Sequence, residues 1–261
     1  MSVTAVAPET TVDAFLGGLV EAVQPKRGHH RAGLEAVLLA SAINPDFAGT
    51  VLDLGAGVGV AGFGVAVRCP GARVILVERD PEAIACAKAA LARPANHAFA
   101  DRVSMVRADI ADWDAGGATA DAVIMNPPFH GSGAGTRSPR AARAAAHVLG
   151  HDGLSPWVHA AATTLKPGGR LVVVFRADRL EALLVALGPR FGAAVILPIR
   201  PRERLPAHRV LVRAMPGNGA AARTLPPLTL HGPAGGAYLP NVDRVLRGEI
   251  GLAEAHAGWG E

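Results

Sequence analysis

The stretch "TVLDLGAGVGVAGFG" (50–64) joins an apolar run to a turn rich in glycine. The run 50–55 has the pattern of a buried strand with Asp53 near its end, and a helical pattern continues from the turn to about Arg68. Glycines let the backbone approach a ligand closely, and open α/β sheets bind ligands at the carboxyl ends of their strands. The stretch therefore predicts the first strand, the ligand-binding turn and the first helix of an α/β fold. The glycines of the turn are Gly55, Gly57, Gly59 and Gly62.

This turn by itself is compatible with two cofactors. Residues 57–62 match the pattern G-x-G-x-x-G of dinucleotide-binding folds, although that match alone is weak. Nicotinamide dinucleotides and S-adenosylmethionine both use a carboxylate at the end of the second strand, where it accepts hydrogen bonds from the ribose hydroxyls. Glu78 stands at that point of the sequence, so it does not separate the two.

From residue 50 onward, short apolar runs alternate with helical patterns. Apolar runs without polar alternation, separated by helices, are typical of parallel strands covered on both faces. The last two runs have no helix-length segment between them and predict an antiparallel hairpin. The expected fold is therefore α/β, with a mostly parallel seven-stranded sheet. The runs are 50–55, 73–78, 102–109, 121–126, 169–175, 192–199 and 208–214.

The segment before this sheet has a different pattern. Residues 13–43 contain a short hairpin-like piece, a basic loop and an apolar helix from about Ala32. We interpret residues 1–45 as a small N-terminal cap packed on the core, residues 46–250 as one α/β domain and residues 251–261 as a C-terminal tail.

Composition narrows the class of protein. The 261 residues contain no run of about 18 apolar residues and no signal-peptide pattern, so we expect a cytoplasmic protein without a membrane anchor. Cys69 and Cys86 lie in helical patterns without metal-ligand neighbours, and we expect neither a disulfide nor a metal site.

The net charge is +4, and basic residues cluster in three stretches rich in Pro or Gly, 25–31, 137–143 and 200–209. Each alone has the composition of ordinary solvated surface. Together they favour a face that contacts phosphates, with Lys26, Arg27, Arg137, Arg140 and Arg143 as candidate RNA contacts.

The ends of the third and fourth strands distinguish the two cofactors. Asp109 ends the third strand, where it can accept from an adenine amino group, and the fourth strand ends in Asn126-Pro-Pro-Phe129. Taken singly, such residues often cap helices or turn the chain. Asp53-x-Gly-x-Gly, Glu78, Asp109 and Asn-Pro-Pro-Phe in this order resemble the motif set of amino-methylating enzymes that use S-adenosylmethionine. The resemblance implies a Rossmann-like class I methyltransferase fold for residues 46–250.

The Asn-Pro-Pro-Phe segment suggests its own chemistry. An amine conjugated to a ring is a poor nucleophile because its lone pair is delocalised. If the side-chain oxygen of Asn126 and the carbonyl of Pro127 accept its two hydrogens, the lone pair is freed for attack. Pro127 and Pro128 fix the chain, and Phe129 can stack on a flat substrate. We discount His130 as a base, because the proton can leave to water.

Stretches 24–40, 205–214 and 230–248, added to these motifs, make the chain similar to the bacterial family that methylates adenine N6 at position 37 of a valine tRNA. The similarity covers roughly residues 13–248. It implies a tRNA partner, and we expect a monomer. It assigns Asn126, Pro127, Pro128 and Phe129 to catalysis, and it assigns to the donor pocket Arg31, Gly33, Asp53, Gly55, Gly57, Glu78, Arg79, Asp109, Ile110 and Asn126.

Other substrates stay open. Phe129 followed by His130 also resembles guanine-N2 methyltransferases of ribosomal RNA, which makes that activity the runner-up. A glutamine-N5 protein methyltransferase would explain the tetrad but not the basic clusters. A non-catalytic RNA-binding module would explain the basic clusters but not the acidic strand ends.

Overall fold

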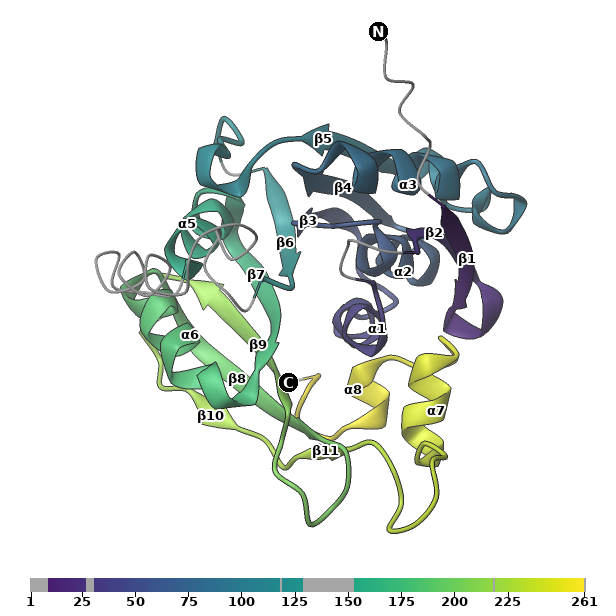
Figure 1. Cartoon of the computed structure of the whole chain (residues 1–261). Coiled ribbons are helices and arrows are strands. Elements are labelled where there is room, and N and C mark those ends of the chain that lie inside the picture. Colours follow the sequence, from purple (N-terminus) through teal and green to yellow (C-terminus); the bar gives the residue numbers. More distant parts are fainter. Residues whose placement is uncertain (1–8, 27–30, 118, 129–152, 218, 261) are drawn as a thin grey trace, which may run out of the picture.

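The computed structural model describes residues 9–26, 31–117, 119–128, 153–217 and 219–260. Its centre is a nine-stranded sheet with the strand order β10-β8-β9-β7-β6-β3-β4-β5 and with β11 beside β8 (Figure 1). The strands are β3 (Gly49–Leu54), β4 (Ala72–Glu78), β5 (Val103–Arg107), β6 (Ala120–Met125), β7 (Leu165–Arg176), β8 (Phe191–Arg200), β9 (Arg209–Pro216), β10 (Arg223–Thr224) and β11 (Leu228–Thr229).

Strands β3 to β7 run parallel, and β9 is antiparallel to both β7 and β8. The α/β class and the mostly parallel sheet are therefore confirmed, and β3 to β9 are the seven strands that the sequence predicts. The two further strands, β10 and β11, have two residues each and pair parallel with β8. They carry too short a pattern to be recognised in the sequence.

Helices cover both faces of the sheet. The helices are α1 (Leu34–Ser41), α2 (Val60–Arg68), α3 (Pro81–Leu91), α5 (Leu154–Thr164), α6 (Leu180–Leu187), α7 (Pro240–Leu246) and α8 (Leu252–Ala255). One buried apolar cluster joins one face of the sheet to α1, α2, α3, α7 and α8, and a second joins the other face to α5 and α6. The strands read as continuous apolar runs because both faces are covered.

The segment before β3 forms a hairpin of β1 (Thr10–Phe15) and β2 (Val20–Pro25). Strand β2 packs against α2 and α3, and Val20 and Ala22 are fully buried there. The side chain of Asn96 accepts a hydrogen bond from Glu21 N at 3.0 Å and fixes the hairpin to the loop after α3. Gly33 precedes α1, which begins two residues later than the sequence pattern indicates.

The C-terminal residues also belong to the packed structure. The indole of Trp259 is completely buried and donates to the carbonyl of Ala42 at 3.3 Å. Cys69 and Cys86 are free and buried.

Candidate active site

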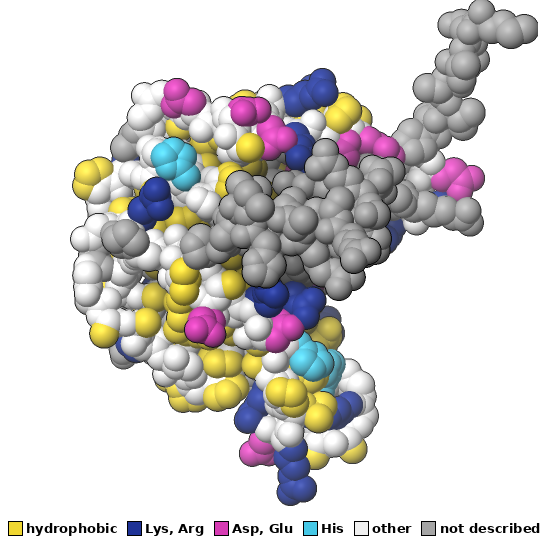
Figure 2. All heavy atoms as spheres, turned by 60° about the vertical axis from the view of Figure 1, so that its left-hand side comes forward, with side chains coloured by type: hydrophobic (Ala, Val, Ile, Leu, Met, Phe, Trp, Pro, Cys, Tyr) yellow, Lys and Arg dark blue, Asp and Glu magenta, His cyan; other side chains and the backbone are white. Residues whose placement is uncertain are grey.

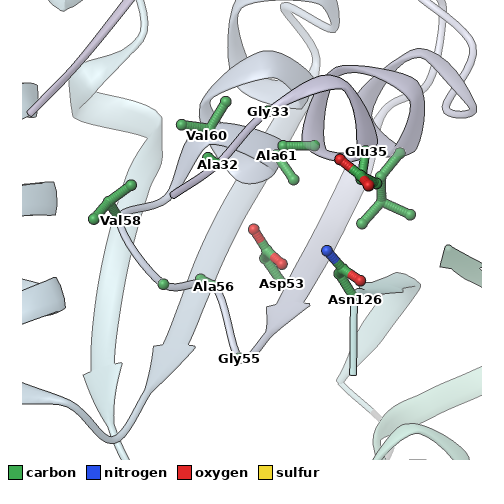
Figure 3. Close-up of a pocket in the computed structure, with 13 residues that line it drawn as sticks. Ala32, Gly33, Glu35, Asp53, Gly55, Ala56, Val58, Val60, Ala61 and Asn126 are labelled. Atoms are coloured by element: carbon green, nitrogen blue, oxygen red, sulfur yellow. The ribbon is translucent and has the colours of Figure 1, made fainter. Parts of the chain in front are cut away.

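A pocket that opens to solvent lies at the carboxyl ends of β3 and β6 (Figure 3). Helix α1 forms one wall, the turn after β3 and the start of α2 form another, and Asn126 closes it from β6. The lining residues are Ala32, Gly33, Glu35, Ala36, Leu39, Asp53, Gly55, Ala56, Gly57, Val58, Val60, Ala61 and Asn126.

The turn between β3 and α2 depends on glycine. Gly55, Gly57 and Gly59 have φ angles of 66°, 56° and 89°, in the left-handed region that favours glycine. A Cβ on Gly55 would lie 2.3 Å from the indole ring of Trp157 on α5, so the ring packs directly on the turn. A Cβ on Gly57 would meet nothing within 4 Å. The backbone at Gly57 therefore faces open space where a ligand can lie.

Asp53 is the buried acid of the pocket. Only 3% of its surface is exposed, and its Oδ2 accepts a hydrogen bond from Gly62 N at 2.9 Å. Burial raises the pKa of Asp53 to about 7, while the Gly62 N–H opposes this rise and the charge of Glu78 adds to it. Close to neutral pH this carboxyl can therefore take up or release a proton.

Glu78 ends β4 beside the same turn. Its Oε2 accepts from Gly57 N at 2.8 Å, and its Oε1 accepts from Arg79 N at 2.8 Å and Asp80 N at 2.9 Å. The carboxylate is held in one orientation and ties the glycine turn to the next strand. Oε1 already accepts two hydrogen bonds, whereas Oε2 accepts one and keeps capacity to accept from a ligand.

Asp109 follows β5 at the next position along the edge. Its Oδ1 accepts from Ala111 N at 3.0 Å and its Oδ2 accepts from Arg79 Nη1 at 3.0 Å. These bonds, that from Ala111 above all, lower the pKa of Asp109 and keep it ionised. Ile110 is buried next to it. Because β6, β3, β4 and β5 are neighbours, Asn126, Asp53, Glu78 and Asp109 follow one another along one edge of the sheet.

Asn126 comes directly after β6, and its Oδ1 is buried without a hydrogen-bond partner in the described part of the chain. Pro127 is buried and Pro128 is exposed. A buried polar oxygen without a partner is costly, so the position favours a donor from a bound molecule. Phe129, Arg27, Arg137, Arg140 and Arg143 lie outside the described residues.

The remaining predicted residues lie in or just after the N-terminal hairpin. Of these, Gly33 lines the pocket. Arg31 instead donates to Asp13 Oδ2 at 2.6 Å and to Thr11 Oγ1 at 2.9 Å, so its side chain holds the hairpin. Lys26 pairs with Glu9 at 3.3 Å on the surface.

The sequence analysis missed two residues at the site, one in the lining of the pocket and one behind the glycine turn. Glu35 lines the pocket from the first turn of α1, where an acid is expected from the helix dipole alone. Trp157 reaches the glycine turn from α5, about 100 residues later in the chain. A single charged residue in an otherwise apolar helix was the one available signal for Glu35, and Trp157 had none.

The described residues contain no group of three or more His, Cys, Asp or Glu placed to hold a metal ion. No helix within the described ranges is both long and apolar enough to cross a bilayer.

A model of the methyltransferase small domain family matches residues 29–193, which include both the glycine turn and Asn126. The chain belongs to this family. The methyltransferase is 32% identical over 227 residues to a tRNA1(Val) (adenine(37)-N6)-methyltransferase of Porphyromonas gingivalis, with 82% of this chain and 86% of the relative covered.

Two further comparisons bear on the methyltransferase. A solved structure described as a predicted O-methyltransferase from Agrobacterium tumefaciens has 31% identity and a TM-score of 0.71, and the match covers 84% of this chain and 98% of that one. Ribosomal RNA small subunit methyltransferase C of Actinobacillus succinogenes is 40% identical over 99 residues, or 38% of this chain and 27% of the relative.

S-adenosylmethionine is the methyl donor of this methyltransferase, and the residues present fit it. The acids along the edge of the sheet can accept from the hydroxyl and amino groups of its adenosine part. The open space at Gly57 and the pocket between β3 and β6 leave room for the rest.

Proposed function

We propose that this methyltransferase transfers a methyl group to an exocyclic amine of an RNA base, adenine N6 at position 37 of a valine tRNA. The observation that carries the proposal is the buried, unpartnered Oδ1 of Asn126 in the pocket at the end of β6. An exocyclic amine can donate the hydrogen bond that this oxygen lacks. S-adenosylmethionine supplies an electrophilic methyl group on a sulfonium sulfur.

Asn126 and Pro127 activate the amine in this mechanism. Asn126 Oδ1 and the Pro127 carbonyl accept one amine hydrogen each, which draws the nitrogen toward tetrahedral geometry and frees its lone pair. Pro127 provides a carbonyl but no competing N–H. The rate then comes from position and electrostatics rather than from a strong base, and the released proton passes to water.

The edge of the sheet holds the donor. Glu78 accepts from the ribose hydroxyls, Asp109 accepts from the adenine amino group, and Gly55 and Gly57 let the backbone approach. Arg79, Ile110 and Gly33 complete this pocket, and Phe129 stacks on the target base. Glu78 is suited to its role because three backbone N–H groups already fix its carboxylate.

The comparisons support an RNA amine over other acceptors. The match to the Porphyromonas gingivalis relative covers most of both chains, and the name of that relative gives the reaction proposed here. The match to the ribosomal RNA methyltransferase covers 38% of this chain, so ribosomal RNA is the second candidate substrate, with guanine N2 as the target that the sequence resemblance implies. The name of the Agrobacterium tumefaciens structure suggests methyl transfer to a hydroxyl group. A hydroxyl has one hydrogen to donate, so it would engage only one of the two oxygens, Asn126 Oδ1 and the Pro127 carbonyl, that are proposed to accept hydrogen bonds.

Methyl transfer from radiolabelled S-adenosylmethionine tests the proposal. The acceptors are unmodified valine tRNA, the same tRNA with guanine in place of the target adenine, ribosomal RNA and a release factor. We expect label in the first alone, recovered as N6-methyladenosine after nucleoside digestion. N2-methylguanosine in ribosomal RNA would support the second candidate, and labelled protein would contradict an RNA substrate.

A further inference from the structure

Three neighbouring strands carry arginine at the same edge of the sheet as the pocket. Arg176 ends β7, Arg209 begins β9 and Arg200 ends β8. Arg176 and Arg209 stand opposite each other in the strand pairing, and Ile199 stands opposite Arg209. The row therefore leads away from Asn126, because β7 is the neighbour of β6.

Part of this charge is balanced on the protein. Arg176 pairs with Asp178 at 2.5 Å, and Arg209 pairs with Glu35 at 3.0 Å. The loop beyond Arg200 adds Arg202 and Arg204, with Glu203 as its only acid. This end of the row thus keeps a positive charge, and Arg204 is exposed.

An aromatic pair stands at the far end of the row. The rings of His231 and Tyr238 stack with centroids 4.6 Å apart and an angle of 23° between their planes. Tyr238 is 38% exposed, and it is the only tyrosine in the chain. An exposed aromatic face with adjacent positive charge is the arrangement that binds unpaired nucleotides.

The protein holds this pair rigidly. Residues 231 and 238 form an isolated antiparallel bridge, and Leu239 N donates to Leu230 O at 2.8 Å. Arg202 donates to the carbonyls of Gly232 and Gly235 and so clamps the loop between the two rings. An aromatic side chain fixed before binding loses little conformational entropy when a base stacks on it.

The distance between the pocket and the aromatic pair is short enough for one RNA molecule to contact both. Four strand intervals separate β6 from β11, which leads into the aromatic pair; at about 4.8 Å each, they span roughly 20 Å. The loops after β8 and β11 project from the lower end of the molecule in Figure 1. Figure 2, turned about the vertical axis, shows Lys, Arg and His side chains gathered in that lower part.

We propose that residues 176, 200–209 and 229–239 form an RNA track, in which the arginines contact phosphates and Tyr238 stacks on an unpaired base of the RNA whose target base enters the pocket. This inference rests on the proposed function. It assigns RNA contacts to described residues other than Lys26.

Binding of fluorescein-labelled valine tRNA, followed by anisotropy at several salt concentrations, tests the track. Tyr238→Ala should weaken binding about fivefold to hundredfold through loss of stacking, and Tyr238→Phe should restore it. Arg204→Glu should weaken binding and reduce the slope of log K against log salt by about 0.7 to 0.9 for the lost contact. Arg73→Glu, an exposed arginine at the opposite edge of the sheet, is the matched control.

Kinetics separate the track from a structural role. The Tyr238 and Arg204 variants should raise KM for tRNA while the affinity for S-adenosylmethionine and the melting temperature stay at the wild-type value. Wild-type tRNA binding by both variants would overturn the track and leave the proposed function intact. Absence of RNA binding by the wild-type protein in this assay would overturn both the track and the proposed function.

Discussion

Glu35 Oε1 accepts a hydrogen bond from Arg209 Nε at 3.0 Å across 174 residues of sequence. The pair joins the first turn of α1 to the start of β9 and leaves Glu35 in the wall of the pocket. Asp53 and Asn126 face the same space, and no Lys or Arg is among the described residues that line it. The pocket is thus rich in acceptors and suited to a positively charged group.

The first prediction concerns Glu35. If Asp109 and Glu78 hold the adenosine as proposed, the amino-acid end of the donor would lie in the pocket between β3 and β6, where Glu35 would accept from its ammonium group. Glu35→Gln should weaken S-adenosylmethionine binding about tenfold or more, as for a lost hydrogen bond between charged groups. Calorimetry with methylthioadenosine, which lacks the amino-acid end, should show no change.

Glu181→Gln, an exposed acid on α6, is the control for this measurement. Equal loss of affinity for both ligands in Glu35→Gln would mean that Glu35 supports the shape of the pocket rather than the ammonium group.

The second prediction concerns Asp53 and stability. With a pKa of about 7, folded Asp53 keeps a proton between about pH 4 and 7 that the unfolded chain has already lost. The free energy of unfolding of the donor-free protein should therefore fall as pH rises through this window and level off above it. Urea denaturation should show a weaker pH dependence for Asp53→Asn, and Asp101→Asn, an exposed acid, should follow the wild type.

Asp53 also links donor binding to pH. A cationic donor favours the ionised carboxylate, so its affinity should rise by up to about tenfold per pH unit below about pH 7. Calorimetry in buffers of different ionisation enthalpy should detect the released proton. Parallel pH profiles for the wild type and Asp53→Asn would refute the link.

The third prediction contrasts two glycines. A Cβ on Gly62 would lie 2.3 Å from Leu76 Cδ2, so Gly62→Ala should destabilise the fold by about 1–3 kcal/mol through overpacking. A Cβ on Gly57 points into open space, so Gly57→Ala should cost only about 1 kcal/mol for its left-handed φ and chiefly weaken donor binding. Thermal melts with and without S-adenosylmethionine measure both effects. The reverse pattern would place the ligand elsewhere.

The fourth prediction concerns Asn126. Asn126→Ala should reduce kcat for methyl transfer about a hundredfold or more and leave donor affinity nearly unchanged, since an oriented acceptor used in the transition state is lost. Asn241→Ala, an exposed residue of α7, controls for the loss of an amide. Turnover within about tenfold of the wild type would exclude the acceptor role of Asn126.

Local pattern was sufficient for the strands and for the order of the motifs along the edge. Asp53, Glu78, Asp109 and Asn126 each lie at or near the end of a continuous apolar run, so each can be recognised within one short segment. Parallel strands then bring their carboxyl ends to one edge of the sheet. For the same reason the left-handed glycines at 55, 57 and 59 could be expected from the turn alone.

Tertiary structure decided which distant residues share that edge. Glu35 meets Arg209, Trp157 covers Gly55, and Tyr238 stacks on His231 beside Arg202 only because strand order and loop packing bring them together. Sequence periodicity shows which face of a segment is buried, but it does not specify the partner that buries it. The acids at the strand ends and the glycines of the turn could therefore be recognised in the sequence, whereas the pocket wall formed by α1 and the arginine row depend on the folded chain.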